Sequence, residues 1–176
     1  MRTVVDDRRR FSRPAVYLHW AIFLLVAIAY LAIEIRGPKG SDSRIFWTAT
    51  HLWAGVSVLT LSLIRVGWRF YRKPPAPEPD NAILLLLAKA THLMLYLFII
   101  GQPILGILMI NLGGHPVTLA GLGSFTIVGE NHDLREIVKW IHETLGNVFY
   151  FVIGLHALAA LFHHFVKRDN TLRRMW

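Results

Sequence analysis

Nine histidines stand in this chain of 176 residues, and two of them, His142 and His156, lie in one predicted membrane helix with a spacing of fourteen residues. In a helix this spacing is close to four turns, so both imidazoles emerge from nearly the same face, roughly 21 Å apart along the axis. That separation suits two redox centres, one near each surface of a bilayer. Each centre would need a partner histidine from another helix at the same level.

The elements that would carry these histidines are four stretches without Asp, Glu, Lys or Arg: Pro14–Ile33, Ile45–Ile64, Ala90–Ile110 and Thr144–Val166. Each has about twenty residues or more, which at about 1.5 Å per residue spans the hydrocarbon layer. The sequence therefore predicts an all-α fold, a four-helix transmembrane bundle of up-down topology in one domain of residues 1–176. We expect the helices at about 14–35, 45–70, 82–110 and 134–166. Pro103 is expected to kink the third helix and Asp133 to cap the fourth.

The basic residues give the bundle an orientation. Of the 19 lysines and arginines, fourteen precede the first helix, lie in or near the connection between the second and third, or follow the fourth. The other two loops hold Arg36, Lys39, Arg44, Arg135 and Lys139. The positive-inside rule then predicts that both termini are cytoplasmic. Membrane lipid is the expected surrounding, and nucleic acid is not an expected partner, because the basic residues flank spans and do not form one face.

The absence of cysteine limits the cofactors that the chain can hold. Disulfides are excluded, and so are iron–sulfur clusters bound by this chain and covalent c-type haem. Any haem must be held by ligation and packing alone.

The predicted topology sorts the span histidines by depth. His19 lies in the cytoplasmic half and His51 in the periplasmic half, while His142 is periplasmic and His156 lies toward the cytoplasm. The pairs His51–His142 and His19–His156 therefore match in level, one in each half of the membrane. This is the arrangement that two bis-imidazole haems need, with these four residues as axial ligands to the iron.

His92 competes with His19 for the cytoplasmic site, because it also enters from that side. Measured from the nearest basic residue, His92 would lie roughly 5 Å deep, His19 roughly 9 Å and His156 roughly 16 Å. His19 is the better match in depth, although helix tilt could remove the difference.

Small residues follow three of these histidines by one turn, namely Gly55, Gly146 and Ala160. A missing or minimal side chain there would let a flat macrocycle lie against the helix. The alternative is that they mark tight helix–helix contact. A single histidine in a span can likewise be an ordinary polar residue bonded to a neighbouring helix, but four at two matched levels favour haem.

With those residues in place, the chain resembles the bacterial cytochrome b561 family, in particular its small inner-membrane dihaem members described as superoxide:ubiquinone oxidoreductases. The resemblance covers nearly the whole chain and is weakest in the outer loop, residues 112–131. Its most specific segments are His142-Glu143-Thr144-Leu145, the stretch from Tyr150 to Ala157, His163-His164 and Asp169-Asn170-Thr171-Leu172, with Leu18-His19-Trp20 as a weaker element.

The resemblance implies two b-type haems, ligated by His19, His51, His142 and His156, in a multi-pass protein of the bacterial inner membrane. It further implies superoxide as the small-molecule substrate and ubiquinone as the electron acceptor, with no obligate protein partner. Two histidines on each iron leave no open coordination position, so such haems pass electrons and do not bind oxygen.

The sequence also offers residues for the two substrates. Arg36, Lys39, Arg44, Arg135 and Lys139 could steer superoxide to the outer side, and Lys139, one turn before His142, is the preferred candidate. On the cytoplasmic side His163 lies two turns beyond His156 and could bond a quinone carbonyl or relay a proton. We expect Ser12, Arg13, His92 and His164 to gather near it.

Two other functions remain open from the sequence. One is a haem-bearing membrane anchor subunit that passes electrons from a periplasmic dehydrogenase or hydrogenase to quinone. It would share the haem ligands and differ in the electron donor. A test for direct reduction of the purified protein by superoxide therefore distinguishes the two functions. The other is a histidine-lined proton or metal transporter without haem, which would lack a reduced b-type absorption spectrum.

Overall fold

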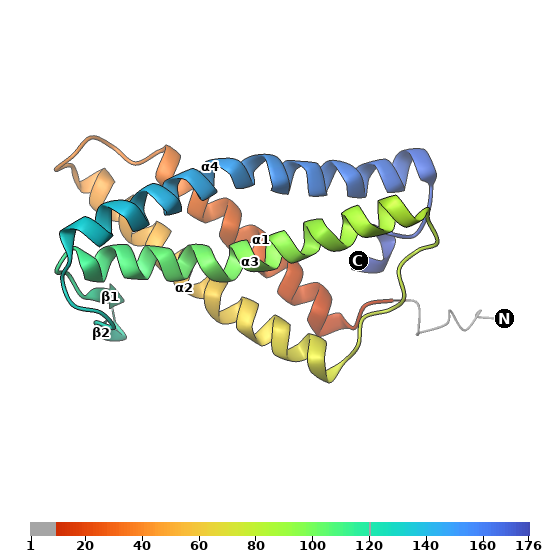
Figure 1. Cartoon of the computed structure of the whole chain (residues 1–176), viewed down its shortest axis with the longest axis horizontal. Helices are drawn as coiled ribbons and strands as arrows, with labels where there is room; N and C mark the ends of the chain where they lie inside the picture. Colours follow the sequence, from red (N-terminus) through yellow and green to blue (C-terminus); the bar gives the residue numbers. More distant parts are fainter. Residues whose placement is uncertain (1–9, 120) are drawn as a thin grey trace.

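The computed structural model describes residues 10–119 and 121–176 and shows four long helices. These are α1 (Arg13–Glu34), α2 (Asp42–Tyr71), α3 (Ala82–Leu112) and α4 (His132–Phe162) (Figure 1). A π-helical turn, η2 (His163–Lys167), continues α4, and a short 3-10 helix, η3 (Arg173–Met175), precedes the C-terminus. Of the basic residues counted above, Arg2, Arg8 and Arg9 lie outside the described residues.

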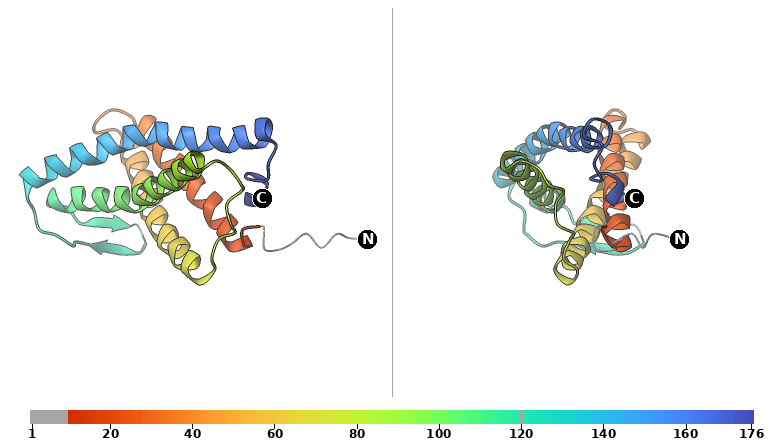
Figure 2. Two further views of the ribbon diagram at one scale, coloured as in Figure 1. Left: turned by 45° about the vertical axis from the view of Figure 1, so that its right-hand side comes forward. Right: turned by 90° about the vertical axis from the view of Figure 1, so that its right-hand side faces the viewer.

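The four helices are long and apolar enough to cross a membrane, with α4 and η2 forming one candidate span. Viewed end-on, they surround a common axis (Figure 2). Few of the described side chains are buried. They include Ala32, Ala54 and Val58, together with Phe98 of α3, which stacks on Phe149 of α4 at 4.0 Å between ring centroids. Most large apolar side chains are exposed and so present an apolar outer surface, as lipid-facing helices do. The predicted four-helix transmembrane bundle is confirmed.

The helix ends differ slightly from the prediction. The N-cap of α4 is Asn131, whose side-chain oxygen accepts a hydrogen bond from the Leu134 amide at 3.0 Å, so the prediction of Asp133 as the cap is wrong. Asp133 lies in the first turn, where its carboxylate interacts favourably with the positive end of the helix dipole. α3 continues through Pro103 and ends at Leu112.

The connection between α3 and α4 holds a small antiparallel hairpin that the sequence did not indicate. β1 (Val117–Leu119) pairs with β2 (Gly123–Phe125), with Val117 opposite Phe125. The buried Asn111 at the end of α3 anchors this connection, because its amide donates to the His115 carbonyl at 3.0 Å and accepts from the Ile127 amide at 2.8 Å. Strands of three residues are too short to show an alternating pattern.

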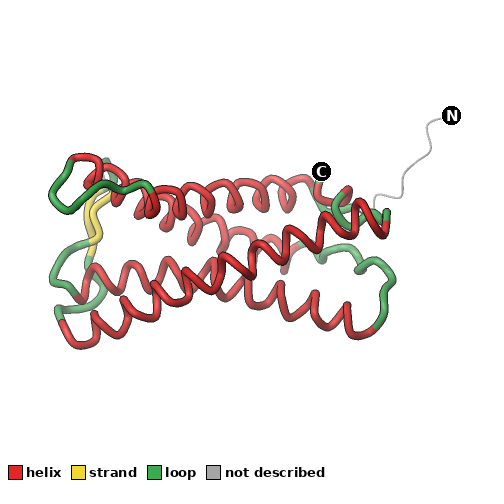
Figure 3. The backbone as a smooth tube through the Cα atoms, turned by 90° about the horizontal axis from the view of Figure 1, so that it is seen from above, coloured by secondary structure: helices red, strands yellow, loops and turns green. Residues whose placement is uncertain are grey.

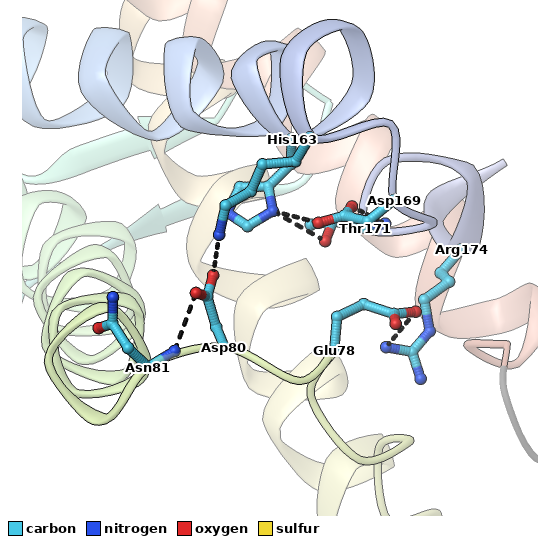
Figure 4. A network of polar contacts seen from close by, with 8 residues as sticks. Glu78, Asp80, Asn81, His163, Asp169, Thr171 and Arg174 are labelled. Atoms are coloured by element: carbon cyan, nitrogen blue, oxygen red, sulfur yellow. Dashed lines mark hydrogen bonds and ion pairs between the residues drawn. The ribbon is translucent and has the colours of Figure 1, made fainter.

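The bundle has two distinct ends (Figure 3). We call the end with residues 35–41, 113–119 and 121–131 the hairpin end. The end with the start of α1, the C-terminus and the α2–α3 linker (residues 72–81) is the terminal end. At the terminal end the C-terminal tail (residues 168–176) and the linker are tied together. Lys167 pairs with Asp80, and Arg174 pairs with Glu78 at 3.4 Å (Figure 4). Arg174 also donates to the Ala76 carbonyl at 2.8 Å.

Candidate functional site

The structure brings the four predicted ligand histidines together as two facing pairs. His51 of α2 and His142 of α4 form the hairpin-side pair, with ring centroids 6.2 Å apart and ring planes at 84°. His19 of α1 and His156 of α4 form the terminal-side pair, at 6.4 Å and 72°. All four side chains are half-buried, and α4 contributes one histidine to each level.

These spacings fit an imidazole on each side of one metal ion. A metal–nitrogen bond of about 2.0 Å and a distance of about 1.1 Å from that nitrogen to the ring centre place two opposed rings about 6.2 Å apart. Within the described residues, no group of three or more His, Cys, Asp or Glu side chains is arranged to hold a bare metal ion. Two opposed imidazoles in an apolar bundle therefore suit a metal whose remaining ligands come from a macrocycle, as in haem.

Backbone carbonyls fix the orientation of both rings in the hairpin-side pair. The Nδ1 of His51 lies 2.9 Å from the Ala29 carbonyl of α1, and the Nδ1 of His142 lies 3.2 Å from the Gln102 carbonyl of α3. A carbonyl accepts only, so each Nδ1 carries the proton. Each Nε2 is then left unprotonated and able to bind iron, and a carbonyl behind the ring is the usual support of a metal-bound histidine.

His92 is the third histidine at the terminal side. Its ring centroid lies 5.3 Å from that of His156, and its Nδ1 lies 2.7 Å from the Ala88 carbonyl of its own helix. This separation is shorter than the roughly 6.2 Å that an intervening metal needs, and His92 is exposed whereas His19 is half-buried. The geometry favours His19 over His92 opposite His156.

Two residues of α3 that the sequence analysis did not single out position His142. Gly106 faces its ring: a Cβ added at Gly106 would lie 3.4 Å from the His142 Cε1. The Gln102 side-chain amide donates to the His142 carbonyl at 2.9 Å. A lone glutamine in an otherwise apolar span was the signal available in the sequence, since a polar side chain there usually bonds a neighbouring helix.

The small residues expected to make room for a macrocycle do not all act alike. Nothing lies within 4 Å of a Cβ added at Gly55, so α2 leaves open space there. Gly146 instead faces Gln102, and its carbonyl accepts a hydrogen bond from the Tyr30 hydroxyl at 2.7 Å. Gly146 thus serves close packing of α4 against α1 and α3, which was the alternative explanation.

Arg65 is a charged residue beside the terminal-side pair; by its position in the sequence it is one of the basic residues near the connection between α2 and α3. It lies within α2, half-buried, and donates to the Ala15 carbonyl at 2.6 Å and to the Tyr96 hydroxyl at 3.3 Å. Ala15 is one turn before His19. Arg65 follows His51 by fourteen residues, so both leave the same face of α2, one at each level. That spacing was the missed signal.

The cations expected to steer an anion toward the hairpin-side pair differ in how far neighbouring groups already bind or neutralise them. Arg135 and Lys139 share one carboxylate, Glu136, at 2.6 Å and 3.5 Å, and Arg44 donates to the Gly37 carbonyl at 3.3 Å. Arg36 and Lys39 form no ion pair with any residue in 10–119 or 121–176. The preferred candidate, Lys139, is therefore partly neutralised.

His163 lies at the junction of α4 and η2, where its Nδ1 approaches an Asp169 carboxylate oxygen at 2.5 Å (Figure 4). Arg168, with φ at 55°, provides the left-handed turn that folds Asp169 back onto His163. Partial burial raises the pKa of Asp169, but the hydrogen bonds from His163 and Thr171 together lower it by a larger amount. The pKa of Asp169 is therefore below its ordinary value.

Three other residues expected around His163, namely Ser12, Arg13 and His164, line two pockets whose described linings do not include His163. Ser12 accepts a hydrogen bond from the Trp68 indole at 2.8 Å, and both it and Arg13 line a basic pocket between α1 and α2. His164 lines a smaller pocket with Arg10, Arg173 and Trp176.

Comparison with known proteins agrees with this architecture. The sequence model of the prokaryotic cytochrome b561 family matches residues 10–176. "Cytochrome b561 homolog 1" of Escherichia coli strain K12 is 40% identical over 169 residues, which cover 94% of this chain and 96% of the relative. "Probable superoxide oxidase CybB" of Yersinia pestis is 36% identical over 168 residues, covering 95% and 96%.

A more distant relative, "Cytochrome b561 homolog 2" of Escherichia coli strain K12, is 31% identical over 129 residues, covering 71% of this chain and 68% of the relative. The family match extends from the start of α1 to the C-terminus and so includes every histidine described above. The chain is therefore a multi-pass bacterial membrane haem protein of the electron-transferring type, and it belongs to the prokaryotic cytochrome b561 family.

Proposed function

We propose that this protein holds two b-type haems and transfers electrons from superoxide to ubiquinone across the bacterial inner membrane. The observation that carries the proposal is the pair of facing imidazoles at each of two levels, 6.2 Å and 6.4 Å between ring centroids. His51 and His142 would hold one haem and His19 and His156 the other. Haem held by these histidines would supply one-electron transfer.

The hairpin end is proposed to face the periplasm and to receive superoxide. The distribution of basic residues supports this orientation, because lysines and arginines concentrate at the terminal end. Superoxide is an anion, so the exposed cations near the hairpin-side pair would raise its local concentration. Arg36 and Lys39 are now the stronger members of the steering set beside Lys139, because Glu136 offsets part of the Lys139 charge. The name of the Yersinia pestis relative supports superoxide as the donor.

The terminal end is proposed to be the quinone side. Reduction of one ubiquinone requires two electrons, supplied by two superoxide anions that become two oxygen molecules, and two protons from the cytoplasm. His163 is positioned to move such protons, since Asp169 bonds its Nδ1 and leaves Nε2 for exchange with quinone or water. A carboxylate behind an imidazole also stabilises the protonated ring, as a proton relay needs.

The direct test is stopped-flow spectroscopy of the purified haem-loaded protein with superoxide and a soluble ubiquinone analogue, with no partner protein added. The proposal predicts haem reduction by superoxide and stoichiometric quinol formation, with a rate that falls as ionic strength rises. Arg36→Gln should weaken this salt dependence. If superoxide failed to reduce a protein that chemical reductants reduce normally, the anchor-subunit function would replace the one proposed.

A further inference from the structure

We propose that the terminal end contains a binding site for the phosphate group of an anionic phospholipid, in the basic pocket between the start of α1, the end of α2 and the linker. The pocket encloses about 1160 Å³. Among the residues that the structure describes, no Asp or Glu lines it and six cationic side chains do: Arg10, Arg13, Arg65, Arg69, Arg72 and Lys73. This site does not depend on the proposed electron-transfer function.

Two cations of this pocket, the half-buried Arg65 and the exposed Arg69, interact with residues of neighbouring helices. Arg65 donates to the Ala15 carbonyl and the Tyr96 hydroxyl, and the Arg69 guanidinium lies 5.9 Å from the centre of the Tyr96 ring. These interactions pre-position two positive charges at the inner wall without neutralising either of them.

The four outer cations lack a counter-charge in the described part of the chain. Arg10, Arg13, Arg72 and Lys73 form no ion pair with residues 10–119 or 121–176. The acidic residues of the adjoining linker are already engaged, since Glu78 pairs with Arg174 and Asp80 with Lys167. Like charges gathered in one pocket repel each other, so a multiply bonded anion would stabilise the arrangement.

The pocket also lies where a lipid headgroup would be. Its wall includes Trp68 near the end of α2, whose indole bonds Ser12, and the exposed side chains of Tyr17 and Trp176. Tryptophan and tyrosine favour the boundary between hydrocarbon and headgroups. Basic pockets between spans on the cytoplasmic side suit anionic headgroups, whose acyl chains could follow the apolar outer surface of α1. A free phosphate ion would use the cations but not this apolar surface.

The test measures binding to the full-length, haem-loaded protein after delipidation in a neutral detergent. Dioleoyl phosphatidylglycerol, dioleoyl phosphatidylcholine and inorganic phosphate are added separately, and bound species are counted by native mass spectrometry. The test variant is Arg72→Gln with Lys73→Gln, two exposed residues whose replacement should leave the haem spectrum unchanged. The matched control is Lys89→Gln with Arg168→Gln, which removes two charges at the same end but outside the pocket lining.

We expect phosphatidylglycerol to bind at least tenfold more tightly than phosphatidylcholine. The test variant should bind phosphatidylglycerol about fivefold more weakly for each cation removed, and the control variant less than twofold more weakly. Equal binding of the two lipids, or equal losses in the two variants, would overturn the site. Inorganic phosphate bound as tightly as phosphatidylglycerol, and lost in the same variant, would also overturn the lipid assignment and leave a free-phosphate site.

Discussion

The hairpin-side and terminal-side histidine pairs have almost the same ring separation but different surroundings. Carbonyls of neighbouring helices fix both rings of His51 and His142. The terminal-side pair has a third histidine, His92, and the cation Arg65 close by. Backbone carbonyls thus orient both rings at one level, whereas a half-buried guanidinium inside the bundle lies beside the other. Two haems with the same ligands can therefore differ in reduction potential, because the charges and hydrogen bonds around a haem help to set that potential.

The largest expected effect is the loss of one haem, which should follow replacement of His19 but not of His92. His19→Ala should lose the terminal-side haem and so about half of the total haem, because its ring stands opposite His156 at 6.4 Å. His92→Ala should keep both haems, since its ring is too close to His156 for iron to lie between them. The pyridine haemochrome assay, normalised to protein, measures both. The reverse pattern would make His92 the ligand.

A second prediction concerns the charge that distinguishes the two levels. Arg65→Gln should lower the reduction potential of the terminal-side haem by roughly 50 mV, as expected when a nearby unit charge is removed in partly solvated protein. The hairpin-side haem should move much less. Redox titration followed in the haem absorption bands resolves the two. Arg72→Gln, farther out along α2, is the control, and equal shifts in Arg65→Gln and this control would remove the special role of Arg65.

The proton relay at the terminal end gives a smaller expected effect. Asp169→Asn should slow quinone reduction by about tenfold while haem reduction by superoxide stays unchanged, because the amide cannot stabilise a protonated His163. His163→Ala should slow it at least as much, and the double variant should add little to the His163 change. Pre-steady-state kinetics with each substrate separates the two half-reactions. Unaltered quinone reduction in both single variants would exclude the relay.

The smallest effect is the acid sensitivity of the C-terminal tail. The hydrogen bond from Lys167 lowers the pKa of Asp80, and the hydrogen bond from His163 helps to lower that of Asp169. A carboxyl with a depressed folded-state pKa stabilises the fold above its unfolded pKa, about 4, and this contribution is lost as pH falls through the folded value. The protection of residues 168–176 against hydrogen exchange, corrected for the intrinsic exchange rate at each pH, should therefore decrease as the pH falls below about 4. The hairpin should show no matching change.

The sequence predicted the parts of this molecule that follow from periodicity and composition. Charge-free blocks located the four spans, and the fourteen-residue spacing of His142 and His156 put them on one face of α4. The sequence did not predict that Asn111 anchors the hairpin or that Gln102 supports His142. Those roles depend on contacts with residues distant in the chain, and a single polar residue in an apolar run does not reveal its partner.

The central claim is that separate spans supply two imidazoles to one iron at each of two levels, and haem counting in α4 variants tests it most directly. His142→Ala and His156→Ala should each retain about one haem per protein, with different absorption maxima, and the double variant should retain none. Measured by the pyridine haemochrome assay and reduced-minus-oxidised spectra, full haem content in the double variant would contradict the account.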